Sequence, residues 1–240
     1  MNAPAQFQGR PVQALLFDLD GTLMDTAGDI ALALQRSMAD QGLSAPTPQA
    51  VRTMIGRGAP SLVQRACAAQ AIEADDALRA VLLQGFFDHY GRLQDEGAYD
   101  AQPYPGALEA VAAVHAAGLP LALVTNKQRR FAQALLRLRG LEPAFRVVCG
   151  GDTCERRKPD PQPLLWAAAQ LGVPPAQTLM VGDSVNDVTA ARAAGMPVLC
   201  MTYGYNEGRD VKTLPADAFA DSMTELPRLL GLAGFVQGQR

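Results

Sequence analysis

Short apolar runs recur along this chain, and polar residues follow each run where it ends. The runs are rich in Val, Leu and Ile, and they cover Val12–Leu19, Pro120–Thr125, Phe145–Gly150, Thr178–Gly182 and Pro197–Met201. A strand with helices on both faces reads as nearly continuous apolar sequence, and helical spacing of apolar residues separates the later runs. The pattern therefore predicts an α/β fold with a parallel sheet, whose ligand site lies at the carboxyl ends of the strands. A shorter run at Ala218–Ala220 predicts an edge strand before a last helix that ends near Leu230.

One long interval interrupts this pattern. Between Thr26 and about Tyr99 no run has strand character, and apolar residues recur at helical spacing in Ile30–Met38, Leu62–Ala69 and Leu78–Leu93. A connection from a strand to a helix is typically only a few residues long, so an insertion of this size predicts a small helical domain. We therefore expect residues 26–98 to form that domain, and residues 1–25 and 99–240 to form the α/β core.

Composition excludes several classes of protein. The 240 residues are 48% hydrophobic and 19% charged, which is enough apolar sequence for a sizeable core. The net charge of −3 comes without a long run of Lys or Arg, so neither nucleic acid nor a membrane is an expected partner. The chain has no apolar leader and no unbroken membrane-length apolar stretch, so a cytoplasmic protein is expected. We expect it to act as a monomer or a homodimer. Its four cysteines and two histidines match no zinc-ligand spacing.

The first apolar run leads directly into a pair of acids, Asp18 and Asp20, followed by Gly21 and Thr22. Carboxylates two residues apart in an extended stretch can converge on one point beyond the strand. Crowding them is costly unless a cation or a proton separates them. Taken alone, the motif fits two interpretations: a polar loop that contains acids, or a nucleophile and an acid/base partner beside a metal.

Three further motifs follow later strand positions. Thr125 and Asn126 supply a hydroxyl and an amide that can donate hydrogen bonds to phosphate oxygens, whereas we interpret the next residue, Lys127, as a solvated surface lysine. Lys158 stands just before a predicted helix and is expected in the active site.

The last of these motifs contains two acids four residues apart. Asp183 ends a predicted strand, and Asp187 falls in the first turn of the next helix. Asp187 could simply cap that helix or complement its dipole. Asp183 has no such explanation, which favours a functional role.

This ordered set of motifs resembles the haloacid dehalogenase superfamily, whose phosphatases carry DxDGT, a strand-ending Thr or Ser, a lysine before a helix, and GDxxxD. The resemblance spans about Val12 to Met201, and it implies a Rossmann-like core with the family's type 1 cap inserted after the first motif. Within the superfamily, the chain looks most like bacterial phosphoglycolate phosphatases in four stretches: the triplet TNK, the sequence KPDP, Thr202–Asn206 and the cap stretch Ile55–Ala59.

The resemblance also implies the chemistry. Asp18 would attack phosphorus to form an aspartyl-phosphate, and Asp20 would protonate the leaving oxygen and then activate the water that hydrolyses the intermediate. Phosphoryl oxygens would be held by Thr125 and Asn126, with Lys158 balancing charge; these three, with Gly21 and Thr22, make up the implied phosphate site.

A Mg²⁺ ion fits this set of ligands because it prefers hard oxygen donors. Its implied ligands are the Asp18 carboxylate, the Asp20 backbone carbonyl and Asp183, with Asp187 acting through water or from outside the first ligand sphere. The expected partner is a small phosphorylated metabolite, 2-phosphoglycolate being the first choice.

In the cap, Arg57 between two glycines offers a planar donor fork that matches a substrate carboxylate. The alternative is that Gly56 and Gly58 only end a cap helix and leave Arg57 in solvent.

Other outcomes of the same motifs stay open. The runner-up is a phosphatase for another small phosphate, such as a sugar phosphate or N-acetylmuramate 6-phosphate. A β-phosphoglucomutase is disfavoured because those enzymes usually carry Val at the position of Thr22. Asp20 argues against dehalogenation, and the absence of lysine between Thr26 and Asp100 argues against phosphonoacetaldehyde hydrolysis. A non-enzymatic phosphoacceptor switch of the receiver type would be about half this length and would lack the insertion.

Overall fold

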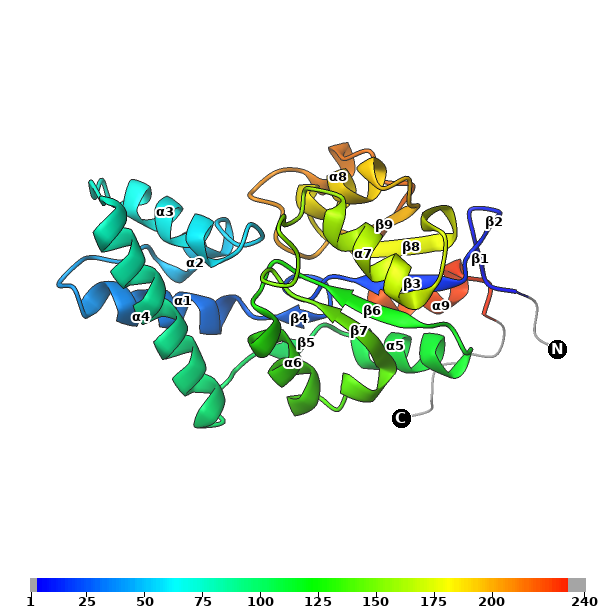
Figure 1. Ribbon diagram of the computed structural model, residues 1–240, viewed down its shortest axis with the longest axis horizontal. Coiled ribbons are helices and arrows are strands. Elements are labelled where there is room, and N and C mark those ends of the chain that lie inside the picture. The colour runs from blue at the N-terminus through cyan, green and yellow to red at the C-terminus, as the bar shows by residue number, and fades with distance from the viewer. Residues whose placement is uncertain (1–3, 233–240) are drawn as a thin grey trace.

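The computed structural model describes residues 4–232, and its centre is a six-stranded parallel sheet (Figure 1). The strand order across the sheet is β10 (Ala218–Ala220), β9 (Val198–Met201), β8 (Thr178–Gly182), β3 (Ala14–Phe17), β6 (Leu121–Val124) and β7 (Phe145–Cys149). Every pairing in it is parallel. The predicted α/β fold is therefore confirmed, and the chain reverses its direction of winding at β3, between β6 and β8.

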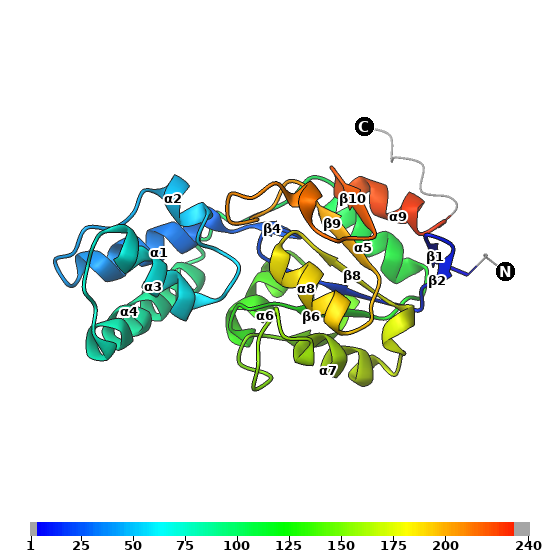
Figure 2. The same cartoon turned by 90° about the horizontal axis from the view of Figure 1, so that it is seen from above.

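Helices cover both faces of this sheet, which is why its strands are apolar throughout. Leu15 and Phe17 of β3 pack with α5 (Ala107–Ala116), α6 (Arg129–Leu138) and α9 (Leu226–Leu229), whereas Leu16 packs with α7 (Gln162–Leu171) and α8 (Val185–Ala193). Figure 1 shows α7 and α8 above the sheet with α5 and α6 below it, and Figure 2 shows the same layers from above. Short 3-10 turns at Glu142–Ala144, Pro175–Gln177, Val211–Thr213 and Met223–Glu225 join these elements.

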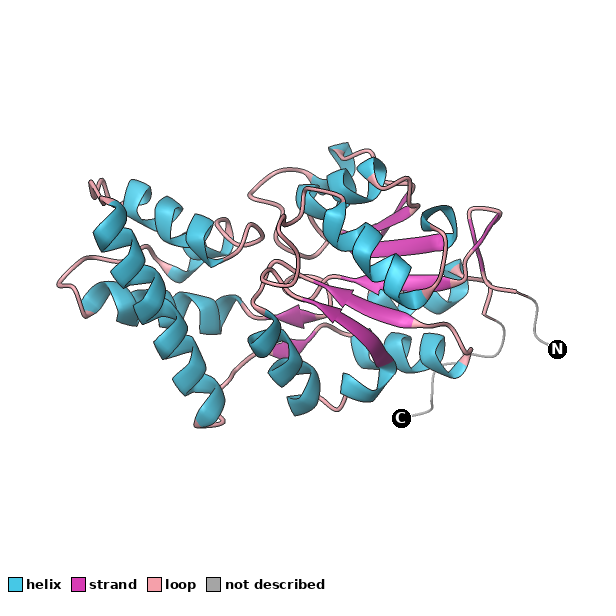
Figure 3. Ribbon diagram, in the orientation of Figure 1, coloured by secondary structure: helices cyan, strands magenta, loops and turns pink. Residues whose placement is uncertain are grey.

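The inserted segment is entirely helical and has an apolar core of its own (Figure 3). Its helices are α1 (Ala27–Ala39), α2 (Pro48–Arg52), α3 (Ala59–Ala69) and α4 (Asp76–Asp95). The short helix α2 was not predicted; Thr47 starts it by accepting a hydrogen bond from the Ala50 amide at 3.3 Å. Two core residues, Phe131 and Tyr205, join the helical cluster, so the two parts meet through apolar contacts. The domain boundaries at residues 26 and 98 stay a prediction.

Two very short strands carry the chain into and out of the helical segment. They are β4 (Met24–Asp25) and β5 (Gln102–Pro103), which pair antiparallel. Asp29 at the start of α1 accepts hydrogen bonds from the amides of Asp100 and Ala101 at 2.9 and 3.0 Å. The entering and leaving chains are thereby fixed side by side. A second small hairpin, β1 (Gln6–Phe7) with β2 (Arg10–Pro11), lies at the other end of the core.

No helix within residues 4–232 is both long enough and apolar enough to cross a lipid bilayer.

Candidate active site

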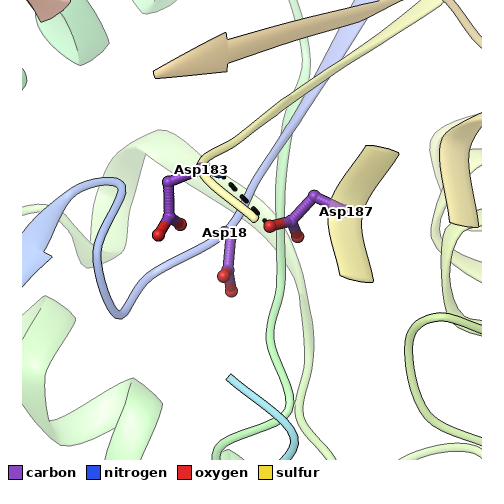
Figure 4. Close-up of side chains that lie close together, drawn as sticks. All are labelled: Asp18, Asp183 and Asp187. Carbon is purple, nitrogen blue, oxygen red and sulfur yellow. Dashed lines mark hydrogen bonds between the residues drawn. The ribbon is translucent and has the colours of Figure 1, made fainter. Parts of the chain in front are cut away.

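The carboxyl ends of the central strands bring the predicted acids together. Asp18 follows β3, Asp183 follows β8, and Asp187 lies in the first turn of α8. Figure 4 shows their carboxylates turned toward one space, and one oxygen of each lies within 4.8 Å of the others. Residues 165 positions apart in the sequence thus form one cluster, because β3 and β8 are neighbours in the sheet.

Lys158 is buried between two of these acids. Its Nζ lies 3.0 Å from Asp18 Oδ1, donates to Asp187 Oδ1 at 2.6 Å and donates to the Val124 carbonyl at 2.7 Å. Burial disfavours the ammonium, but the Asp18 and Asp187 carboxylates outweigh that penalty and raise the pKa of Lys158. The lysine is therefore a permanent positive charge beside Asp18, in the place where the sequence predicted one.

Both oxygens of Asp187 already have partners within the protein. Oδ1 accepts from Lys158, while Oδ2 accepts from the Ser184 hydroxyl at 2.7 Å and from the amides of Ser184 and Asp183 at 3.1 and 3.3 Å. The last of these bonds is the dashed line in Figure 4. Asp187 therefore orients Lys158 and the turn that carries Asp183. This arrangement agrees with an indirect role at a metal, although that role stays a prediction.

Asp183 is held rigidly by the first motif and by the loop after β9. The Thr22 hydroxyl donates to its Oδ1 at 2.6 Å, and the Tyr205 amide donates to its Oδ2. Gly21 has φ +91°, and a Cβ there would overlap Asp183 Oδ2, so this position requires glycine. Gly21 and Thr22, predicted to bind substrate, thus lie against Asp183, and neither lines the cavity described below.

The acid cluster fits a divalent cation. Asp18 Oδ1 is buried and has no hydrogen-bond partner among residues 4–232, because its contact with Lys158 lacks hydrogen-bond geometry. Burial raises the pKa of Asp18 to about 7; Lys158 opposes this shift, and the charges of Asp187 and Asp20 reinforce it. Burial and the neighbouring acids also raise the pKa of Asp183. Crowded carboxylates with raised pKa values and a free oxygen are what a hard cation would stabilise.

Asp20 faces a different set of partners. Its Oδ1 accepts from the Thr26 hydroxyl at 2.6 Å and from Lys127 Nζ at 2.9 Å. The interpretation of Lys127 as a solvated surface lysine is wrong: its side chain is only 7% exposed, and Nζ lies 4.6 Å from the centre of the Tyr90 ring of α4. A partner 107 positions away in the sequence and a ring from the cap explain this burial, and the sequence pattern reveals neither.

Thr125 and Asn126 follow β6 and are both buried. The Asn126 side-chain amide donates to the Gly56 carbonyl of the cap at 2.8 Å and to the Lys158 carbonyl at 2.9 Å. The Thr125 hydroxyl accepts from the Lys127 amide at 3.2 Å. This turn therefore fixes three parts of the site at once: the cap loop, Lys158 and Lys127.

A cavity lies between the sheet edge and the cap, and its two walls differ in character. The core wall is polar, with Asp18, Asp20, Thr125, Asn126, Lys127, Gln128 and Arg157. The facing wall is mostly apolar: the cap contributes Ile30, Ile55, Gly56, Gly58, Ala59, Pro60, Leu62, Phe86, Phe87 and Tyr90, and the core adds Phe131 of α6. The described residues thus offer charge and hydrogen-bond donors to one end of a ligand and an apolar surface to the rest.

Arg57 lies outside the residues that line this cavity. Its guanidinium makes a two-pronged ion pair with Glu207 of the core, at 2.6 and 3.0 Å, and Arg65 adds a third contact at 3.0 Å. The Glu207 side chain is 5% exposed, and the two arginines lower its pKa against the effect of burial. The sequence missed this link between cap and core, because the loop after β9 has no periodic pattern.

Comparison with known proteins identifies the family of the chain. The family model described as haloacid dehalogenase-like hydrolase matches residues 15–201, and the chain belongs to that family. It is 43% identical over 216 residues to the phosphoglycolate phosphatase of Thiobacillus denitrificans, covering 90% of this chain and 94% of that protein. It is also 43% identical to the plasmid-borne phosphoglycolate phosphatase of Cupriavidus necator, covering 92% and 94%.

Solved structures agree with these relatives. A protein described as a predicted phosphoglycolate phosphatase from Haemophilus somnus superposes with a TM-score of 0.85 at 32% identity, over 91% of this chain and 97% of the other. CbbY from Rhodobacter sphaeroides, solved with phosphate, has a TM-score of 0.78 at 25% identity, over 92% and 100%. The chain is therefore an enzyme of the phosphoric monoester hydrolase class.

Proposed function

We propose that this enzyme hydrolyses 2-phosphoglycolate to glycolate and phosphate, with Asp18 as the nucleophile and Mg²⁺ as the cofactor. The observation that carries the proposal is the environment of Asp18: a buried carboxylate with one unpartnered oxygen, next to the ammonium of Lys158 and facing Asp183. A nucleophile for phosphorus needs a free oxygen and nearby positive charge.

The first step forms a bond between an Asp18 oxygen and phosphorus and breaks the bond from phosphorus to the ester oxygen. Asp20 donates a proton to that oxygen, so glycolate leaves as an alcohol. Thr125 and the Asn126 backbone amide hold phosphoryl oxygens, and Lys158 balances their charge. In the second step Asp20 takes a proton from water, which attacks phosphorus and releases phosphate and free Asp18.

The residues proposed to hold Mg²⁺ are the Asp18 carboxylate, the Asp20 backbone carbonyl and Asp183, with Asp187 orienting its neighbours. When bound, such an ion neutralises charge on the phosphoryl oxygens and on Asp18. Asp183 suits this role because Thr22 and Tyr205 fix its orientation in advance. The donor set is all oxygen, which favours Mg²⁺ over softer metals.

The choice of substrate rests on the relatives named phosphoglycolate phosphatase and on the character of the cavity. Its apolar cap wall offers few hydrogen-bond partners for the many hydroxyls of a sugar. The partner is accordingly a small phosphorylated metabolite, and neither nucleic acid nor a membrane is part of the proposal.

The test is a comparison of kcat/KM with Mg²⁺ for 2-phosphoglycolate, ethyl phosphate, several sugar phosphates and N-acetylmuramate 6-phosphate. We expect 2-phosphoglycolate to exceed each of the others by at least about tenfold, the value of one well-placed polar contact. A sugar phosphate at the head of the series would replace the proposed substrate, and conversion of β-glucose 1-phosphate to the 6-phosphate would identify a mutase instead.

A further inference from the structure

Few positively charged side chains line the cavity, although 2-phosphoglycolate carries both a phosphate group and a carboxylate. Within residues 4–232, the cations that line it are Lys127 and Arg157. Lys158 contacts Asp18 and donates hydrogen bonds to Asp187 and the Val124 carbonyl, and it does not line the cavity. Arg57 is held by Glu207 outside the cavity. The residue that recognises the second anionic group must therefore come from a short list.

Lys127 is fixed in place more firmly than a surface lysine. Its backbone amide donates to the Thr125 hydroxyl at 3.2 Å, and its carbonyl accepts from the Gly151 amide at 2.7 Å. The ammonium is enclosed by Asp20 and by the face of the Tyr90 ring. The turn proposed to hold phosphoryl oxygens thus also sets the distance from those oxygens to the Lys127 ammonium.

Arg157 is less suited to the role. Its side chain belongs to an exposed residue, and its Nε donates to the Gly151 carbonyl at 2.6 Å. Lys127 Nζ, by contrast, lies 2.9 Å from Asp20, the residue proposed to contact the ester oxygen of the substrate.

We infer that Lys127 binds the carboxylate of the substrate and sets the preference of the enzyme for carboxylate-bearing phosphate esters. The inference rests on the proposed function, since it assumes a phosphate ester whose leaving group is anionic. In 2-phosphoglycolate one methylene separates the carboxylate from the ester oxygen, so a cation in contact with the acid at that oxygen is within reach of the carboxylate. A buried ammonium facing a neutral alkyl group gains no such partner, and this difference is a source of selectivity.

The experiment measures kcat/KM for 2-phosphoglycolate and for ethyl phosphate, which lacks only the carboxylate function. In Lys127→Met we expect the ratio of the two values to fall about 10- to 100-fold, the range for one charge-assisted hydrogen bond. Both esters release a poor alcohol leaving group, so a disturbance of Asp20 should lower both values by a similar factor and change their ratio little. Lys127→Arg keeps the charge and should recover part of the ratio. Arg157→Gln is the matched control; because Arg157 is exposed and solvent screens its charge, this variant should leave the ratio within about threefold.

A binding measurement separates recognition from chemistry. In an Asp18→Asn background, which cannot turn over, titration calorimetry with 2-phosphoglycolate should show a Kd that Lys127→Met raises by a similar factor. Binding of ethyl phosphate should change by much less.

Each other outcome overturns the inference in a distinguishable way. If wild-type enzyme prefers 2-phosphoglycolate and Lys127→Met keeps that preference, the inference is wrong and the proposed function stands. If Arg157→Gln removes the preference instead, the receptor is Arg157. If wild-type enzyme shows no preference for 2-phosphoglycolate over ethyl phosphate, the proposed substrate is wrong and the inference falls with it.

Discussion

The core wall of the cavity is polar, whereas the cap wall that faces it is apolar. At the sheet edge on the core side, five polar residues are buried: Asp18, Thr125, Asn126, Lys158 and Asp183. The first three line the cavity, while Lys158 and Asp183 lie outside its lining, and all but Thr125 have side-chain partners from distant parts of the sequence. On the cap wall, apolar side chains such as Ile55, Leu62 and Phe86 face the same space and also belong to the cap's own core. The difference assigns the chemistry to the core and the exclusion of water to the cap.

Besides the apolar packing of Phe131 and Tyr205 on the cap, several polar contacts join the two parts at the seam where the core meets the cap. Asn126 reaches the Gly56 carbonyl, Lys127 lies against Tyr90, and Glu207 pairs with Arg57 and Arg65. These contacts position the cap relative to the core, whereas the hydrogen bonds of the acid cluster lie within the core. We therefore expect substitution of Asp18 to lower turnover most, and substitutions at the seam between core and cap to alter selectivity or closure.

The largest expected effect is on the core wall, at Asp18. Asp18→Asn is nearly isosteric but removes the nucleophile and one anionic ligand, so kcat should fall by at least about a thousandfold. The melting temperature of the metal-free variant should not fall, because one charge leaves a crowded acid cluster. A purified variant with more than about a tenth of the wild-type kcat, within the reach of a single lost hydrogen bond, would exclude Asp18 as nucleophile.

Asp20→Asn should have a smaller effect that depends on the leaving group. A poor leaving group needs the proton that Asp20 donates, whereas p-nitrophenolate departs without it. We expect kcat/KM to fall about 100-fold or more for ethyl phosphate, within the usual range for general acid catalysis, and clearly less for p-nitrophenyl phosphate. Equal losses for both esters would argue against an acid role for Asp20.

Removal of the metal should abolish activity and reveal the raised pKa of Asp18. Asp18 has a pKa of about 7 in the folded protein and an ordinary value in the unfolded chain. The folded state therefore holds this proton more tightly, and the free energy of unfolding of the metal-free protein should fall as pH rises from about 4 to 7. Mg²⁺ binding displaces that proton, so the rise in melting temperature caused by Mg²⁺ should grow with pH up to about 7 and then level off. Thermal unfolding with and without chelator, across this range, makes the test. Full activity in excess chelator would contradict the metal assignment.

The smallest expected effect is at the contact between cap and core where Arg57 pairs with Glu207. The Arg57 side chain is 44% exposed, and Arg65 keeps the buried Glu207 side chain paired when Arg57 is lost. Arg57→Ala should therefore change kcat/KM by about fivefold or less, the effect of a solvent-exposed ion pair. If the pair with Glu207 only steadies the closed cap, the change should be equal for 2-phosphoglycolate and ethyl phosphate, and Glu207→Gln should match it. A loss confined to 2-phosphoglycolate would instead support the sequence prediction that Arg57 reads the carboxylate.

The sequence predicted the regular part of the molecule well. Strands β3 and β8 were predictable because buried parallel strands must be apolar, and the acids at their ends were predictable as neighbours because all carboxyl ends share one edge of the sheet. The pairing of β4 with β5 was not predictable, since two-residue strands carry no pattern. The predicted strand Val12–Leu19 is longer than β3, which ends at Phe17 where the chain turns to present Asp18.

The contacts between the core and the cap could not be predicted, because each depends on how the two parts meet in space. Whether a lysine is buried depends on its partners, and those of Lys127 come from Asp20 and from Tyr90 in the cap. Tyr205 lies in the stretch Thr202–Asn206 that resembles phosphoglycolate phosphatases, but its contacts with the cap, like those of Glu207, come from an irregular loop with no periodic pattern. The residues at the end of a strand can be identified from the local sequence. The residues that meet between the core and the cap cannot.

The most direct test of the central claim, two successive transfers at phosphorus through Asp18, is the stereochemical course of the reaction. A phosphate ester made chiral at phosphorus with oxygen isotopes and sulfur would be hydrolysed in isotopically labelled water, and the configuration of the product determined. Each in-line transfer inverts phosphorus, so attack by Asp18 followed by attack of water predicts overall retention. Inversion would mean a single direct attack by water, and it would contradict the assignment of Asp18 as the nucleophile.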